Sequence, residues 1–248
     1  MKTIAFINQK GGVGKTTTAI NVGAGLAQLG KRVLLIDIDP QSHLTASLGI
    51  VHQPNKTIYE VLKGELTPAD AIIKRLDGLF VLPAAITLST LEKELSGKKW
   101  LEILLKEALK GSKGYDFVLI DCPPSLGILT TNALMTAQAA CIPVQTEYLA
   151  LQGLTHTLTA LEVAKRLNKP LELDGALCTH YDSRKILSRN TVQSIKSFFK
   201  EKVFKTFIRD NIALAEAPGY GQTIFEYRPI SSGAEDYLNL SREILKRG

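Results

Sequence analysis

The sequence has 248 residues, of which 45% are hydrophobic and 22% charged, as is ordinary for a soluble globular protein. The three cysteines, Cys122, Cys141 and Cys178, form no close pair, which argues against a disulfide framework or a zinc site and favours the reducing cytoplasm. A formal charge of +6 permits binding to nucleic acid or an anionic membrane without requiring it, and no apolar run is long enough for a signal peptide or a spanning helix.

Short apolar runs alternate with longer amphipathic stretches along the chain. This pattern predicts an α/β fold, with a doubly wound, mostly parallel sheet and helices on both faces. The predicted strands are Thr3–Ile7, Arg32–Ile36, Leu79–Leu82, Phe117–Ile120, Ala140–Pro143 and Gly175–Cys178. The predicted helices are Lys15–Leu29, Leu101–Lys110, Leu129–Thr136, Thr155–Leu167, Ser188–Lys200 and Ala234–Lys246. We expect loops and short helices at the sheet's edge for Val51–Ser96, and a single domain over residues 1–248.

A glycine-rich run lies between the first predicted strand and the first predicted helix, and it reads Gln9-Lys10-Gly11-Gly12-Val13-Gly14-Lys15-Thr16-Thr17. Glycines let successive backbone N–H groups turn toward one anion, and the following helix points its positive end at the same place. Lys15 can reach the β- and γ-phosphates, and the Thr16 hydroxyl can ligate Mg²⁺. The run therefore predicts a P-loop that binds ATP and Mg²⁺, with Gln9 where the usual first glycine would stand.

Acidic residues follow two other predicted strands, where α/β sheets bind their ligands. Asp37 and Asp39 come after one of them, and Asp121 comes after another. A carboxylate at the tip of a buried strand is costly unless a metal, a water or a donor satisfies it. Together with the P-loop, Asp121 is predicted to hold Mg²⁺ directly or through water. Asp39 is predicted to orient the attacking water within the metal site, and Asp37 to stand in the metal's outer shell. Taken singly, each could be a helix N-cap or a turn acid.

Basic charge is concentrated in residues 184–209, which carry eight basic side chains and one acid, a local charge of +7. The eight are Arg184, Lys185, Arg189, Lys196, Lys200, Lys202, Lys205 and Arg209. Spacings of seven and four place Arg189, Lys196 and Lys200 on one helix face. The opposite face, which would turn to the core, carries Val192, Ile195, Phe198 and Phe199. The stripe indicates either salt-sensitive, sequence-independent DNA binding or simply a solvated helix face.

These motifs resemble the deviant Walker family of ATPases and, within it, the ParA/Soj branch. The matching segments keep their order along nearly the whole chain: residues 3–48, Asp116–Asn132, Tyr181–Arg184, Ala215–Pro218 and Ser232–Glu235. The Asp-x-Asp-Pro-Gln run that begins at Asp37 favours ParA/Soj over the MinD, nitrogenase iron-protein and arsenite-pump branches.

The resemblance implies roles for individual residues. Lys10 would be the lysine that reaches the nucleotide of a partner subunit, so that hydrolysis depends on dimerisation and involves Lys10, Lys15 and Asp39. The phosphates and metal would be held by Gly11, Gly12, Val13, Gly14, Lys15, Thr16 and Thr17, and Asn211 would lie beside the adenine. ATP would close two subunits into a sandwich dimer that binds DNA non-specifically on the nucleoid. A ParB/Spo0J-like partner would stimulate an otherwise weak hydrolysis, and no membrane binding is implied.

One segment departs from the family. Its members commonly read Pro-Arg-Asn-Val-Arg-Leu where this chain has Arg209-Asp210-Asn211-Ile212-Ala213-Leu214. Both family arginines are absent, so either Arg209, or Lys205 and Arg189, would compensate for them, or DNA binding would be weaker or rearranged. Three alternatives remain open: an ATPase of this type that positions a cargo other than DNA, a P-loop metabolic enzyme such as a small-molecule ligase or kinase, and a nucleotide-dependent binding module with negligible turnover.

Overall fold

The computed structural model describes residues 1–95 and 99–247, and seven strands of this part of the chain form one sheet in the order β3-β4-β2-β5-β1-β6-β7. The parallel strands are β1 (Lys2–Phe6), β2 (Val33–Asp37), β4 (Leu79–Leu82), β5 (Phe117–Asp121), β6 (Ala139–Gln145) and β7 (Glu172–Thr179). Only the edge strand β3 (Ile73–Leu76) runs antiparallel among the described strands. The predicted mostly parallel sheet is confirmed.

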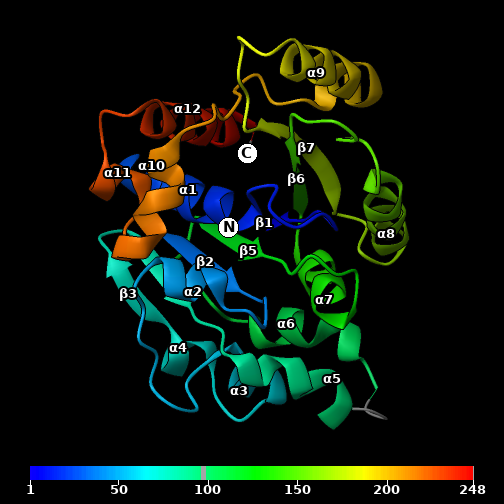
Figure 1. Ribbon diagram of the computed structural model, residues 1–248. Helices are drawn as coiled ribbons and strands as arrows, with labels where there is room; N and C mark the ends of the chain where they lie inside the picture. The colour runs from blue at the N-terminus through cyan, green and yellow to red at the C-terminus, as the bar shows by residue number, and fades with distance from the viewer. Residues whose placement is uncertain (96–98, 248) are drawn as a thin grey trace.

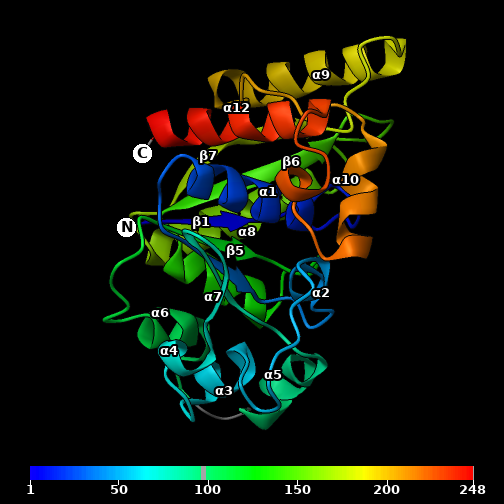
Figure 2. The same cartoon turned by 90° about the vertical axis from the view of Figure 1, so that its left-hand side faces the viewer.

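Helices cover both faces of the sheet (Figures 1 and 2). The first face carries α1 (Lys15–Gln28), α2 (His43–Ser47), α10 (Ile212–Glu216), α11 (Ile224–Tyr227) and α12 (Ser232–Arg247). The second carries α3 (Ile58–Lys63), α4 (Pro68–Ala71), α5 (Leu91–Glu94), α6 (Leu104–Ala108), α7 (Ile128–Thr136), α8 (Leu154–Leu167) and α9 (Ile186–Phe199). The 3₁₀ turns are η1 (Ile86–Thr90), η2 (Leu101–Ile103), η3 (Lys200–Lys202) and η4 (Ala217–Tyr220).

Two hydrophobic cores lie on the two sides of the sheet because successive strand residues point to opposite faces. In β1, Ile4 and Phe6 pack under α1 and α12, whereas Ala5 packs under the helices of the second face, as does Ile7 directly after the strand. The central strands are fully buried, as their continuous apolar runs predict. No helix of the described residues combines the length and the apolarity needed to cross a bilayer.

Strand β3 was not predicted, because Ile73-Lys74-Arg75-Leu76 carries two charges and has no apolar run. An edge strand tolerates such residues, since one of its sides faces solvent. Arg75 also has a structural task, as its guanidinium donates to the carbonyls of Leu48 (2.9 Å) and Gly221 (2.7 Å). The segment Val51–Ser96 therefore contributes strand β3 in addition to the predicted strand Leu79–Leu82, which is β4. Its last residue, Ser96, lies outside the described residues.

Two predictions about helices were wrong. Leu101–Lys110 is a 3₁₀ turn followed by the short helix α6. The reason is Asn132, whose amide accepts from Leu105 N–H (3.0 Å) and donates to Leu101 O (2.6 Å), the two groups that an uninterrupted helix would join. Phe198 does not face the core: it is 50% exposed, while Val192, Ile195 and Phe199 are buried.

Candidate nucleotide-binding site

The turn between β1 and α1 has the backbone of an anion-binding loop. The backbones of Gly12 (φ 74°) and Gly14 (φ 88°) lie in the left-handed region, which residues other than glycine rarely adopt. No side chain caps the N-terminus of α1 and no acid lies in its first turn, so its positive end is open to a ligand. Asn8 links the loop to β6, since its amide donates to Pro143 O (2.8 Å) and accepts from Lys10 N–H (3.0 Å).

A cavity of about 870 Å³ opens above this loop. Of the predicted site residues, those that line it are Gly11, Gly12, Gly14, Lys15, Thr16, Thr17, Asp39, Arg209 and Asn211. Val13 does not: its side chain is buried, and its carbonyl accepts from the Thr179 hydroxyl at 2.9 Å. The opposite wall comes from the chain around α10, so the cavity joins two segments that are about two hundred residues apart in the sequence.

Lys15 is a buried cation at the floor of the cavity, only 7% exposed. Burial lowers the pKa of its ammonium group, and the charges of Asp121 and Asp39 act in the opposite direction. Its Nζ donates to Lys10 O over 3.3 Å. A buried ammonium so placed favours an anionic ligand such as a phosphate.

The three acids at the strand ends have different environments. Asp37 has its donors within the protein: Thr45 N–H (2.9 Å), the Thr45 hydroxyl (2.7 Å) and Asp39 N–H (3.2 Å). Burial nevertheless raises the pKa of Asp37 to about 6. Asp39 accepts Gln41 N–H at 2.9 Å and lines the cavity.

Asp121 is fully buried, and neither of its carboxylate oxygens has a hydrogen-bond partner among the described residues. Burial raises its pKa well above the usual range, and the charge of Asp37 adds to this, while Thr16 and Lys15 act to lower it. Burying such a carboxylate is costly unless a metal ion, a water or a proton satisfies it.

Mg²⁺ fits this arrangement. The described residues contain no group of three His, Cys, Asp or Glu side chains that could hold a metal by themselves. Mg²⁺ does not need such a cage, because it typically keeps several waters and takes one or two protein ligands plus phosphate oxygens. The Thr16 hydroxyl and the Asp121 carboxylate would provide such a partial set beside the phosphate loop. Thr16 and Asp39 line the cavity, whereas Asp121 is buried next to Thr16 and Lys15 and is not part of the lining.

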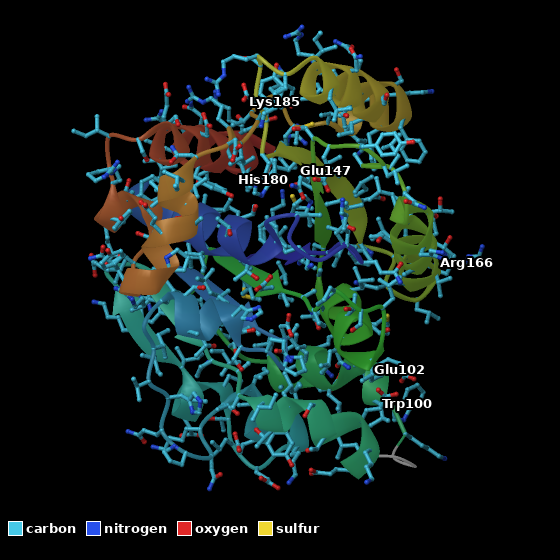
Figure 3. The ribbon with its side chains drawn as sticks, in the orientation of Figure 1. Trp100, Glu102, Glu147, Arg166, His180 and Lys185 are labelled. Atoms are coloured by element: carbon cyan, nitrogen blue, oxygen red, sulfur yellow. The ribbon has the colours of Figure 1, made fainter. Side chains whose placement is uncertain are left out.

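The Lys10 ammonium forms an ion pair with Glu147 of the same chain. Figure 3 shows Glu147 and His180 together on the side of α9, whereas Trp100 and Glu102 lie far from them. Lys10 is not in the cavity wall, so its ammonium is not placed on the phosphate site of its own subunit.

The predicted DNA-contacting residues fall into two groups. The first is neutralised by acids: Arg184 pairs with Asp182 through two bonds of 3.0 Å, and Lys185 lies 3.7 Å from the same carboxylate. Arg209 belongs to the cavity wall, where Asp236 and Glu235 bind it. The second group is exposed and has no acidic partner among the described residues: Arg189, Lys196, Lys200 and Lys205. The local charge is therefore smaller than the sequence suggests.

A parallel sheet with a glycine loop at the start of α1, a buried lysine and an unpartnered strand-end carboxylate define a P-loop nucleotide-binding protein. The model of a family described as "AAA domain" matches residues 1–173. The chain is 46% identical to the sporulation initiation inhibitor protein Soj of Bacillus subtilis, over 100% of this chain and 99% of that one. It is also 46% identical to the chromosome-partitioning ATPase Soj of Thermus thermophilus, over 100% and 96%. The chain belongs to the ParA/Soj family of partitioning ATPases.

Among solved structures, the chain is similar to one described as a cobyrinic acid a,c-diamide synthase from Mycobacterium smegmatis with bound ADP and magnesium. The TM-score is 0.86 and the identity 36%, with 99% of this chain and 94% of that chain covered. That protein thus holds a nucleotide and the predicted metal on the same fold.

Proposed function

We propose that this chain is one ATPase domain that binds ATP with Mg²⁺, dimerises around the nucleotide and hydrolyses it slowly. Its ATP-bound dimer binds DNA without sequence preference, and a ParB/Spo0J-like partner stimulates hydrolysis on the nucleoid. The observation that carries the proposal is the buried, unpartnered carboxylate of Asp121 beside the phosphate loop. A cation such as Mg²⁺, bound beside the phosphate loop, would offset the cost of burying this carboxylate.

The residues of the cavity divide the work of phosphoryl transfer. The open N-terminus of α1 and Lys15 bind the phosphates and neutralise their charge. Thr16 and Asp121 would hold Mg²⁺, which would supply positive charge near the transferred phosphoryl group. Asp39 accepts Gln41 N–H through one oxygen, and its other oxygen orients the attacking water. Asn211 lines the cavity, and in this proposal it lies beside the nucleoside.

Lys10 supports a switch based on dimerisation. Its ammonium is held outside the cavity of its own subunit, so the phosphate site lacks one positive charge that a partner subunit can supply. Because phosphoryl transfer depends on positive charge near the transferred group, hydrolysis in the monomer is weak. ATP therefore times the association of two subunits.

The exposed face of α9 supports DNA binding. Arg189 and Lys196 lie on it, and Lys200 and Lys205 follow it; all four are exposed and unpaired among the described residues. Phosphate contacts from such residues release counterions, which gives affinity without sequence preference and a steep dependence on salt.

Two measurements test the proposal. Lys15→Ala should abolish binding of ATP with Mg²⁺; binding and turnover at native levels would reject the nucleotide site.

A salt titration of DNA binding with ATP, ADP or no nucleotide should show binding with ATP alone. Replacing both Lys196 and Lys200 by Gln should reduce the slope of log affinity against log salt by about 0.9 per lost phosphate contact. The matched control, Arg184→Gln with Lys185→Gln, should change it less, because these two charges are already paired with Asp182 and Asp210.

The likeness to the diamide synthase structure supports a second candidate, an ATP-dependent amide-forming enzyme. Such an enzyme needs a carboxylic acid substrate and an ammonia donor. ATP turnover that depends on these two and ignores DNA would favour it. The two full-length Soj relatives at 46% identity favour the partition ATPase.

A further inference from the structure

The cavity has two ends that offer different groups to a ligand. At one end, Lys15 and the open N-terminus of α1 offer positive groups to a phosphate, with the carboxylates of Asp39 and Asp121 nearby. At the other end the single charge of Arg209 meets the two carboxylates of Glu235 and Asp236. A polyphosphate is therefore attracted to the first end. The uncharged nucleoside of a bound ATP, which the proposed function requires, extends toward the second.

The wall at this second end is held by Arg209. Its backbone N–H donates to Asp236 Oδ2 at 2.9 Å, its Nε lies 3.0 Å from both oxygens of that carboxylate, and its Nη2 donates to Oδ1 at 2.6 Å. Nη2 also donates to Glu235 Oε2 at 2.5 Å. The side chain of Asp236 is only 8% exposed. Forked, charge-assisted bonds of this kind are shorter and stronger than neutral hydrogen bonds, and they fix the angle between the two groups.

Asn211, two residues after Arg209 in the cavity wall, is also bound to α12. Asn211 caps α10 by accepting Ala213 N–H at 2.9 Å, and its amide donates to the Ser232 hydroxyl at 2.7 Å. Ser232, Glu235 and Asp236 all belong to the first turns of α12. Residues 208–210 are joined to β7 and the chain after it by backbone bonds from Ile208 and Asp210. This wall segment is thus hydrogen-bonded to the region of β7 on one side and to α12 on the other.

We propose that Arg209 is a positioning residue for the nucleoside. Through Asp236 and Glu235 it fixes the wall that carries Asn211 at the correct distance from the phosphate loop. It thereby contributes to the affinity for a nucleoside triphosphate and not to the affinity for the triphosphate alone. Its place in the cavity wall also removes it from the DNA-contacting surface.

The test compares two ligands, ATP and inorganic tripolyphosphate, each titrated with Mg²⁺ into the full chain. Arg209→Gln should weaken ATP binding about tenfold, since one charged hydrogen-bond network is lost, and leave the tripolyphosphate affinity unchanged. Asp236→Asn should have the same effect, and the double variant should lose little more than either single variant because the two residues act as one unit. Arg209→Lys, which keeps the charge but not the fork, should fall between.

Arg184→Gln is the matched control, because it breaks an equally forked pair with Asp182 that lies outside the cavity wall; it should alter neither affinity. If Arg209→Gln folds poorly, Glu235→Gln removes only the exposed partner and should give a smaller loss for ATP alone. An unaltered ATP affinity in Arg209→Gln, or an equal loss for both ligands, overturns the proposal and leaves the proposed function standing. A native protein that binds neither ligand overturns both.

Discussion

The burial of the Asp121 carboxylate lowers the stability of the free protein, and bound Mg²⁺ would offset this loss. A buried carboxylate without donors destabilises the fold. We expect Asp121→Asn to raise the free energy of unfolding of the nucleotide-free protein by about 1 kcal/mol or more. The same variant should bind ATP with an affinity that no longer depends on Mg²⁺. Urea unfolding without nucleotide, and ATP titrations with Mg²⁺ or EDTA, measure the two effects.

Asp116→Asn is the control for this prediction. Asp116 is exposed just before β5 and accepts Arg32 N–H at 2.8 Å. This variant should lose a little stability and keep the Mg²⁺ dependence. If Asp121→Asn were destabilised and still bound ATP in a Mg²⁺-dependent manner, the carboxylate would have no part in the metal site.

The Lys10–Glu147 ion pair must break before Lys10 can act in a partner's site. Because both side chains are partly exposed, the pair is worth at most about 1 kcal/mol. Glu147→Gln should therefore strengthen ATP-dependent dimerisation about two- to fivefold, as measured by sedimentation or light scattering across protein concentrations. Glu172→Gln, which breaks a similarly exposed pair with Lys165, should have no effect. Weaker dimerisation of Glu147→Gln would show that Glu147 itself stabilises the dimer.

At the scale of elements, α12 fastens the chain that follows η3. Glu243 accepts from Lys205 N–H (2.8 Å), Thr206 N–H (3.0 Å) and the Thr206 hydroxyl (2.9 Å). Burial acts to raise its pKa, but these donors and the charge of Arg247 outweigh it, so the pKa of Glu243 lies below the ordinary 4.5. When the pKa of an acid is lower in the folded than in the unfolded state, the acid adds stability at pH values above its pKa in the unfolded state. This stability is lost as the pH falls through its pKa in the folded state.

We therefore expect Glu243→Gln to reduce the free energy of unfolding by about 1 kcal/mol at pH 7. The difference from the native protein should shrink as the pH falls below 4.5. Urea unfolding at pH 7 and pH 3.5 checks this. Glu92→Gln, at an exposed position without an ion pair among the described residues, should show no such change. A difference that is the same at both pH values would mean that the charge of Glu243 contributes nothing.

The sequence predicted those elements whose signal is local. Buried strands such as Phe117–Asp121 are nearly continuous apolar runs, and the P-loop and its strand-end acids follow from spacing alone. Strand β3 has no such run. The binding of Arg209 by Asp236 joins residues 27 positions apart, and neither position carries a pattern that marks it, since an acid near a helix start is ordinary. The error at Phe198 arose because helical periodicity shows which side of a helix is apolar but not how wide a part of that side packs against the core.

At the scale of the whole molecule, two lysines of one loop should have separable effects. Lys15→Ala should remove nucleotide binding, whereas Lys10→Ala should keep the ATP affinity of the monomer and lose ATP-dependent dimerisation. The reason is that Lys10 lies outside its own cavity. Titrating ATP at low protein concentration and measuring mass at high concentration separates the two. Loss of monomer ATP binding in Lys10→Ala would contradict the division of roles.

Helix α12 also sets the order in which the site can form during synthesis. The ribosome delivers β1 and the phosphate loop early, but the wall around Asn211 is fastened to Ser232, Glu235 and Asp236. In Figure 2, α12 lies along α1 and next to α10, after every other described element in chain order. A nascent chain without α12 therefore carries a phosphate cradle with no fixed place for the nucleoside. ATP should therefore stabilise the finished protein more than a chain that stalls before α12.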